Sequence, residues 1–264
     1  MKRMRRRKTF FIAIVASIIF VTFISNWRGV WSADIPARSE SLNFRANADK
    51  DVRAPSANLS TPTLQQFANL PLAFEANQDQ ADQRIRLLAR EAGGELQLSD
   101  NSVTLRSKSS ALSFHFKGAN GTPRMVGEEP LVERRNFLLG NNRSKWRTDV
   151  PTFRLVVYKQ LYPGIDVSFY GNQKQIEYDF EVAPGADPRA IRLSFDRHVR
   201  AQVSDGGDLV LKSRDVELIQ RKPIFYQTIA GQRRVIDGKY YLLSNREVGF
   251  EVGDRKSTRL NSSH

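Results

Sequence analysis

The stretch that decides the fold is YKQLYPGIDVSFYGNQKQIEYDFEVAPGADP, residues 158–188. Apolar and polar side chains alternate along residues 165–170 (IDVSFY) and again along residues 176–182 (IEYDFEV). This period of two is typical of a strand with one buried face. Residues 171–174 (GNQK) supply turn formers between the two segments. The stretch therefore predicts a β-hairpin whose apolar side chains meet a core while its acids face water.

Short segments with similar alternation follow one another from Leu70 to Gly253, with breakers such as Gly93-Gly94, Asn120-Gly121 and Gly206-Gly207 between them. The sequence shows no long helical pattern and no fixed repeat period. Many short strands at this spacing favour an antiparallel sandwich or barrel over a parallel α/β sheet. We therefore expect an all-β, antiparallel β-sandwich-like domain over residues 63–253.

The N-terminus carries six Lys and Arg residues within residues 2–8, followed by an uncharged apolar run from Phe10 to Ile24. A basic start and an apolar run together are typical of a secretory signal. We expect residues 1–33 to form a signal peptide or an uncleaved membrane-anchor helix, and either alternative exports the protein, secreted or held at the cell surface. Residues 34–62 have few apolar side chains to bury and predict a flexible, disordered tether.

The net charge of +13 is concentrated at the two ends of the chain. Residues 2–8 contribute six of these charges and residues 254–264 a net two, which leaves +5 for the remainder. A surplus of this size is ordinary for a protein surface, so we expect no nucleic-acid partner. The absence of cysteine from the sequence excludes a disulfide framework and a thiolate metal site.

The last residues, DRKSTRLNSSH (254–264), resemble the in-frame translation of a sequencing-library adapter. We expect this tail to be non-native and the all-β domain to be truncated at its C-terminus. The natural protein is then expected to continue past Gly253.

Several segments resemble one protein family in order and spacing: PLAFEANQDQ (71–80), NFLLGNNRSKWRTDVPTF (136–153), LYPGIDVSFYGNQKQIEYDFEVAPGADPRAIRLSF (161–195), DLVL (208–211), KPIFYQ (222–227) and VGFEVG (248–253). The family is the exported, functionally uncharacterised β domain that precedes seven-bladed β-propeller-type repeats in large bacterial surface proteins. The resemblance implies downstream propeller repeats as a partner, and it implies no catalytic residues. No propeller repeat follows in this sequence, which the adapter tail explains.

One position departs from the family pattern. Asp79 stands where the family more often has glycine in an N-Q-G-Q turn. The geometry of that turn is therefore left open by the sequence.

Three acids, Glu177, Asp179 and Glu181, alternate along one strand of the hairpin and are expected to share one face. Neighbouring members lie about 7 Å apart, twice the rise per residue, and an inverting glycosidase holds its two carboxyl groups at such a separation. The same row is also ordinary for a solvated strand face, which is the favoured interpretation. An extracellular carbohydrate-binding or glycan-processing module is the alternative.

Asp166 lies on the other strand of the hairpin, and with Asp179 it offers the oxygen ligands that calcium prefers. No D-x-D-x-D-G loop accompanies them, so solvated acids balanced by basic neighbours are favoured over a calcium site. His115 and His198 do not form a close pair suited to zinc, and no G-x-S-x-G motif supplies a serine nucleophile. We expect no cofactor other than this calcium candidate.

Trp146 lies between Lys145 and Arg147 in a polar stretch. It either plugs one end of the core, which is favoured because large aromatics bury area readily, or forms an exposed platform for a sugar. The basic pairs Arg134-Arg135 and Arg233-Arg234 have no aromatic ladder beside them and are expected to protect strand edges.

The sequence thus predicts a non-catalytic structural or interaction domain of an exported bacterial surface protein. Its expected partners are downstream propeller repeats, an extracellular protein or glycan, and a membrane through the N-terminal segment. The candidate ligand-binding residues are Trp146, Asp166, Glu177, Asp179 and Glu181.

Overall fold

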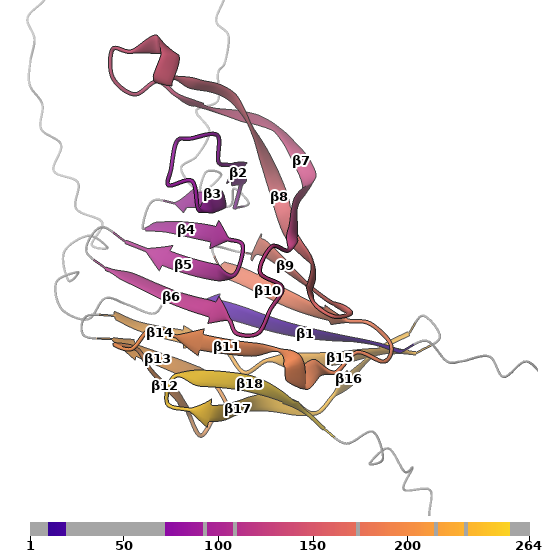
Figure 1. Cartoon of the computed structure of the whole chain (residues 1–264). Helices are drawn as coiled ribbons and strands as arrows, with labels where there is room; N and C mark the ends of the chain where they lie inside the picture. The colour runs from indigo at the N-terminus through magenta and orange to yellow at the C-terminus, as the bar shows by residue number, and fades with distance from the viewer. Residues whose placement is uncertain are drawn as a thin grey trace, which may run out of the picture. The chain divides into compact units, whose positions relative to one another are not determined.

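The structure is a computed structural model that describes residues 10–19, 72–91, 94–107, 110–172, 175–213, 216–229 and 232–253. Within these ranges the secondary structure consists of strands β1 to β18 and two 3-10 turns (Figure 1). All strand pairings are antiparallel. The expected all-β, antiparallel fold class is therefore confirmed. None of the described helical segments has the length and apolar character needed to span a membrane.

The strands in the first half of the described chain are β1 (Phe10–Ile19), β2 (Phe74–Ala76), β3 (Ile85–Glu91), β4 (Gly94–Ser99), β5 (Ser102–Arg106), β6 (Ala111–Phe116), β7 (Arg124–Phe137), β8 (Arg147–Tyr162) and β9 (Ile165–Asn172). Those in the second half are β10 (Gln175–Val182), β11 (Arg192–Phe195), β12 (Arg200–Val203), β13 (Leu209–Ser213), β14 (Val216–Gln220), β15 (Ile224–Ile229), β16 (Gln232–Ile236), β17 (Gly238–Ser244) and β18 (Glu247–Val252). The 3-10 turns are η1 (Arg143–Lys145) and η2 (Pro188–Ala190).

The hairpin that the sequence predicts is formed by β9 and β10. Its register places Phe169 opposite Tyr178 and Ser168 opposite Asp179. The apolar members of both strands are buried, as the period of two requires; they are Ile165, Val167, Phe169, Ile176, Tyr178, Phe180 and Val182. The central prediction of the sequence analysis is confirmed.

Hydrogen bonding joins the strands into one continuous sheet that folds into two layers. One layer runs β16-β15-β1-β10-β9-β8, and the other runs β3-β4-β5-β6-β11-β18-β17. β2 connects the layers because it pairs with both β3 and β8. β14, β13 and β12 continue from the end of β1.

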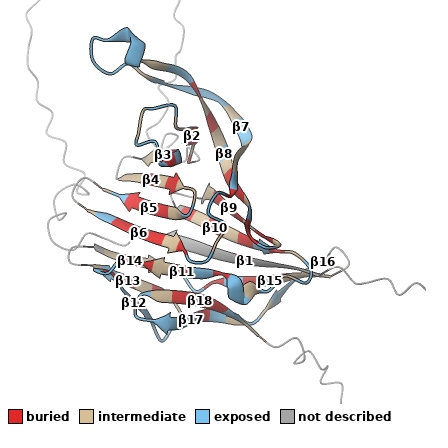
Figure 2. Cartoon of the chain, in the orientation of Figure 1, coloured by how far each residue is buried: buried red, intermediate tan, exposed pale blue. Residues whose placement is uncertain are grey.

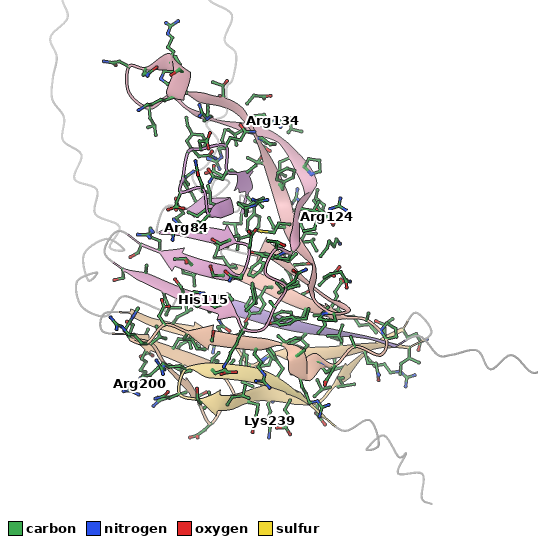
Figure 3. All side chains as sticks on the ribbon, in the orientation of Figure 1. Arg84, His115, Arg124, Arg134, Arg200 and Lys239 are labelled. Carbon is green, nitrogen blue, oxygen red and sulfur yellow. The ribbon has the colours of Figure 1, made fainter. Side chains whose placement is uncertain are left out.

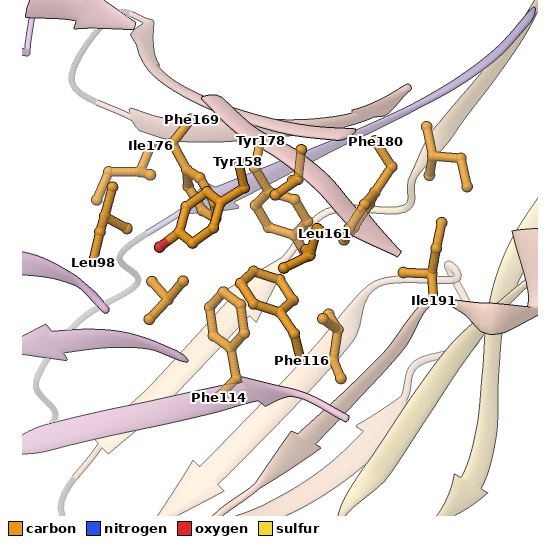
Figure 4. Close-up of a cluster of buried hydrophobic side chains, with 14 of the residues drawn as sticks. Leu98, Phe114, Phe116, Tyr158, Leu161, Phe169, Ile176, Tyr178, Phe180 and Ile191 are labelled. Carbon is orange, nitrogen blue, oxygen red and sulfur yellow. The ribbon is translucent and has the colours of Figure 1, made fainter. Parts of the chain in front are cut away.

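The core lies between these layers and is rich in aromatic rings (Figure 4). Phe114 of β6 packs against Tyr178 of β10 with ring centroids 6.1 Å apart, and Phe116 meets Phe180 edge-on at 6.3 Å. Such offset and edge-to-face contacts add to the free energy gained by burying the rings. The core therefore depends on side chains that alternate along strands distant in sequence.

β1 occupies a segment where the sequence analysis expects a signal or anchor helix. The described part, Phe10–Ile19, is an extended strand between β10 and β15, and Ile14 is fully buried. A short apolar run rich in β-branched residues suits a central strand as well as a membrane segment, because periodicity alone does not separate the two. Residues 1–9 and 20–33, the tether (34–62) and the tail (254–264) lie outside the described residues. Export by this segment stays a prediction.

Candidate functional site

The acid row lies on the face of β10 that points away from the core. Glu177 and Asp179 are partly exposed and Glu181 is exposed, whereas the alternating Tyr178 and Phe180 are buried. The structure thus places the three acids on one strand face, as expected. Asp166 is opposite Glu181 in the β9–β10 register, not opposite Asp179.

Asp179 is the most strongly perturbed member of the row. Its Oδ1 accepts a hydrogen bond from the Tyr170 hydroxyl at 3.0 Å. Partial burial raises the pKa of Asp179 to about 6, and the nearby Glu177 and Glu181 charges add to the rise against the lowering effect of Tyr170 and Arg233. Burial, together with the charges of Asp179 and Glu177, raises the pKa of Tyr170 above its ordinary value. This part of the hairpin therefore favours a neutral Asp179 in mildly acidic solution.

The calcium interpretation finds little support in the surroundings of Asp166. The Asp166 carboxylate accepts a hydrogen bond from the Gln160 backbone N–H at 2.7 Å and lies 3.7 Å from Lys159 Nζ. Across the described ranges, no three His, Asp or Glu side chains gather closely enough to hold a metal ion. These contacts match the favoured alternative of acids balanced by basic neighbours.

Two surface depressions formed by the described residues have linings that do not include the acid row. One, of about 550 Å³, is bordered by η2 and by Tyr241 and Leu243 of β17. The other, of about 390 Å³, lies between the turn after β2 and Phe153. An enzyme that processes glycans needs its carboxyl groups in a concave site that buries the sugar. Neither depression gives the glycan-processing alternative such a site.

His115 meets an acid that the sequence does not single out. Its Nε2 lies 3.2 Å from Asp196 Oδ1, between β6 and the turn after β11. The hydrogen bonds of the described residues include none between a serine hydroxyl and this imidazole. The pair therefore links β6 to the turn after β11.

Trp146 lies in the loop that joins β7 to β8, not at an end of the core. Its Nε1 donates a hydrogen bond to the Gly140 carbonyl at 3.0 Å, and the Arg143 guanidinium lies 5.4 Å from the ring centroid. The favoured interpretation of Trp146 as a core plug is wrong. The indole therefore holds the loop together, through its hydrogen bond to Gly140 and its stacking with Arg143.

This loop ends a hairpin that extends beyond the rest of its layer (Figure 1). β8 pairs with β2 at residues 152–153 and with β9 from Leu155 onward, whereas residues 147–151 pair only with β7 in the described part of the chain. We call residues 131–150 the arm, and residues 134–148 the arm tip. A two-stranded hairpin of this kind is marginally stable unless it is held elsewhere.

The arm exposes large apolar side chains, most of them in its tip. Val132 is 94% exposed, Leu139 is 70% exposed and Leu138 is 55% exposed. Figure 2 shows the arm as largely exposed, in contrast to the buried strands of the core. Exposed apolar residues that cluster in this way mark an interaction surface more often than scattered ones do.

The same tip is strongly basic. Its five cationic residues are Arg134, Arg135, Arg143, Lys145 and Arg147, and no acid lies between Glu133 and Asp149. Figure 3 shows side chains projecting from this end of the hairpin, with Arg134 labelled on it. The arm tip therefore combines positive charge with exposed leucines and an indole.

Three contacts fix the arm to the strands beside it. Arg147 donates hydrogen bonds to the Gln78 carbonyl and to Asp79 Oδ2. Arg90 of β3 stacks on the Phe137 ring at 5.2 Å. These contacts lie where the β7–β8 pairing ends, at Phe137 and Arg147, and leave Leu138 and Leu139 exposed.

Sequence reasoning missed the two leucines because the apolar run at residues 137–139 is typical of a strand. β7 instead ends at Phe137, and Leu138 and Leu139 turn into the loop. The signal was present as an apolar pair with basic residues on both sides and no acid between Glu133 and Asp149. Of the predicted site residues, only Trp146 belongs to this surface.

A family model described as Domain of unknown function (DUF7948) matches residues 74–260. The match covers every strand from β2 to β18 and continues into residues 254–260, which the adapter interpretation assigns to a non-native tail. No curated protein matches the chain, and no solved structure does.

Proposed function

The chain belongs to the family Domain of unknown function (DUF7948), and from this premise we propose that it is a non-catalytic interaction domain of an exported bacterial surface protein. In this proposal its arm tip docks on an anionic membrane surface. The observation that carries the proposal is the coincidence of Leu138, Leu139 and Trp146 with five cations at the end of one hairpin.

Each kind of side chain in the arm tip suits one region of a membrane surface. Burying a leucine side chain in the headgroup–acyl boundary yields about 1.5 to 3 kcal/mol. An indole prefers the interface, where its ring is in apolar surroundings and its N–H finds an acceptor. A Lys or Arg near anionic headgroups adds about 1 kcal/mol. The tip presents these groups together. An acidic soluble protein would engage the positive charges but would not account for the two exposed leucines, so a membrane is the favoured partner.

A label at the tip tests the proposal without interference from the N-terminal segment. The chain contains no cysteine, so Leu139→Cys accepts a single polarity-sensitive dye in the full chain. Val235→Cys on β16 is the matched control, because Val235 is 69% exposed and Leu139 is 70% exposed. The vesicles contain either phosphatidylglycerol or only phosphatidylcholine.

The expected result is a shift of the Leu139 label to shorter wavelength with phosphatidylglycerol vesicles and a much smaller shift with phosphatidylcholine. The Val235 label is expected to stay unchanged with both. No shift at position 139, or equal shifts at both positions, would overturn membrane docking. A shift produced by soluble polyglutamate but not by vesicles would identify an acidic protein as the partner class.

Two finer features of the proposal come from resemblances, the first to the repeat-associated family and the second to a translated sequencing adapter. Propeller-type repeats follow the domain in the natural protein, and residues 254–264 are an adapter-derived tail. The similarity of residues 161–195 to domains in that setting supports the first feature. The genomic reading frame beyond Gly253 tests both, because repeats encoded there are expected and a continuous frame that encodes residues 254–264 would contradict the second.

A further inference from the structure

β1 is held on both sides by the rest of the domain. Residues 12–18 pair with β10, residues 10–15 pair with β15, and residues 18–19 pair with β14. The described parts of β10 and β15 do not pair with each other, so β1 bridges them. β10 and β15 thus present two strand edges, and both edges form hydrogen bonds with the same inserted strand, β1.

The core also depends on this insertion. Ile14 is fully buried, and the register places it opposite Phe180 on one side and Phe225 on the other. Phe180 and Phe225 both contact the ring of Phe250. Ile14 therefore completes a cluster to which several strands contribute.

The inserted strand lies outside the region that defines the family. The family match begins at residue 74, and β1 ends at Ile19. The described strands from β2 onward all fall within the match. β1 is thus connected to the domain as a tethered ligand would be, through residues 20–73.

The sequence of β1 suits a second environment. Phe10 to Ile24 is an uncharged apolar run that follows six cations. A bilayer removes apolar residues from water, and the gap between β10 and β15 does the same for Ile14. One segment cannot occupy both places at once.

We propose that the gap between β10 and β15 is a donor-strand site, that Phe10–Ile19 of the same chain is its ligand, and that this ligand leaves the site when it enters a membrane. Main-chain hydrogen bonds to both edges supply affinity, and alternate apolar side chains supply specificity. An empty site exposes two strand edges, which are templates for pairing with other chains. The ligand class is an extended apolar strand that runs antiparallel to both neighbours.

Disulfide trapping in the full, otherwise cysteine-free chain tests occupancy. The register places Ala13 opposite Glu181 across β1 and β10. Opposed positions on antiparallel strands have Cβ atoms about 4.5 to 5.5 Å apart, close to what a disulfide needs. The pair Ala13→Cys/Glu181→Cys is therefore expected to form an intramolecular disulfide in aqueous buffer. Ser17→Cys/Glu177→Cys, at the other end of the register, is the second trapping pair.

The matched control shares one cysteine with the first pair. Asp166 is opposite Glu181 on the side of β9, so Asp166→Cys/Glu181→Cys reports folding of the β9–β10 hairpin without β1. The proposal is overturned if this control forms its disulfide while both β1 pairs fail. Disulfide-linked dimers in place of internally cross-linked monomers would overturn the claim that the inserted strand belongs to the same chain.

Adding membranes before oxidation tests release. Phosphatidylcholine vesicles are the probe, since their zwitterionic surface does not engage the basic arm tip. Trapping of both β1 pairs is expected to fall about tenfold, which corresponds to about 1.4 kcal/mol in favour of the bilayer. The control pair is expected to cross-link equally with and without vesicles. Undiminished trapping of the β1 pairs would overturn the exchange with the membrane.

Discussion

Arg147 of the arm donates a hydrogen bond to Asp79 Oδ2 at 3.1 Å, which joins the start of β8 to the turn after β2, 68 residues away in sequence. Asp79 has a φ of 72°, in the left-handed region that favours glycine. This is the position at which the family resemblance leads us to expect glycine. Asp79 thus adopts an unfavourable backbone conformation, and its carboxylate forms the ion pair with Arg147 that holds the arm.

Substitution at Asp79 separates these two effects. Asp79→Gly removes the ion pair and relieves the backbone, whereas Asp79→Ala removes the ion pair and keeps the unfavourable φ. We expect Asp79→Gly to be more stable than Asp79→Ala by about 1 kcal/mol in urea unfolding. An alanine variant as stable as the glycine variant would contradict the left-handed geometry.

The perturbed carboxyl of Asp179 predicts a pH-dependent stability. Its pKa of about 6 in the folded protein is above its ordinary value of 3.8. The folded state therefore binds more protons than the unfolded state between these values, and the stability that this group contributes is lost as the pH rises through about 6.

Asp179→Asn removes the titration and keeps an oxygen for the Tyr170 hydroxyl. Near pH 7.5 the variant is expected to be more stable than the parent chain by about 1 to 3 kcal/mol, at about 1.4 kcal/mol per pKa unit. Below about pH 3.5 the difference is expected to vanish, because both chains are then neutral at this position. Thermal unfolding over this pH range checks the result, and a difference that does not change with pH would refute it.

A buried hydrogen bond between β10 and β14 predicts a loss of stability. The Tyr178 hydroxyl donates to Gln220 Oε1 at 2.8 Å, and both residues are fully buried. Tyr178→Phe leaves the amide oxygen with only a long 3.5 Å contact to the Tyr240 hydroxyl. We expect a cost of about 1 to 3 kcal/mol in urea unfolding. Tyr241→Phe, at a tyrosine that is 53% exposed, is the control and is expected to be neutral.

The charge of the arm tip predicts a graded loss of vesicle affinity. Arg135 and Lys145 make no ion pair in the described part of the chain, so Arg135→Gln/Lys145→Gln removes charge without breaking one. The labelled Leu139→Cys protein carrying these substitutions is expected to bind phosphatidylglycerol vesicles about 2 kcal/mol more weakly, or roughly thirtyfold. Arg200→Gln/Arg234→Gln, at two exposed arginines that make no ion pair in the described part of the chain, is the matched control. An equal loss in both variants would point to net charge and not to the arm.

The parts of the fold that could be predicted from sequence are those with a strict local pattern. The β9–β10 hairpin follows from alternation, and the expected break at Gly206-Gly207 falls between β12 and β13. Each of these signals is contained within a few residues. The local sequence pattern is therefore sufficient to predict these elements.

The arm could not be predicted in the same way because its strands depend on each other. Residues 131–136 (LVERRN) do not alternate strictly, and the three left-handed residues Glu129, Asp149 and Gln160 make the hairpin irregular. The register between β7 and β8 shifts at two places along the arm. Trp146 was assigned to the core for a related reason, since its size indicates burial but not which surroundings provide it.

Among the candidate residues, the acids were placed correctly on one strand face, but their neighbours could not be foreseen. The contact of Tyr170 with Asp179 follows from cross-strand packing, and the Lys159 partner of Asp166 lies in an irregular part of β8. Likewise, the apolar pattern of Phe10–Ile19 is common to a signal and a central strand. Only the pairing partners show which of the two a given structure contains.

The emission of Trp146 tests the central claim, that the arm tip is the surface through which the domain docks, most directly. A chain carrying Trp27→Phe and Trp31→Phe keeps Trp146 as its one tryptophan. With phosphatidylglycerol vesicles, a shift to shorter wavelength and quenching by brominated lipid are expected. Protein that sediments with the vesicles while the Trp146 emission stays unchanged would contradict the claim, because another part of the chain would then be responsible for binding.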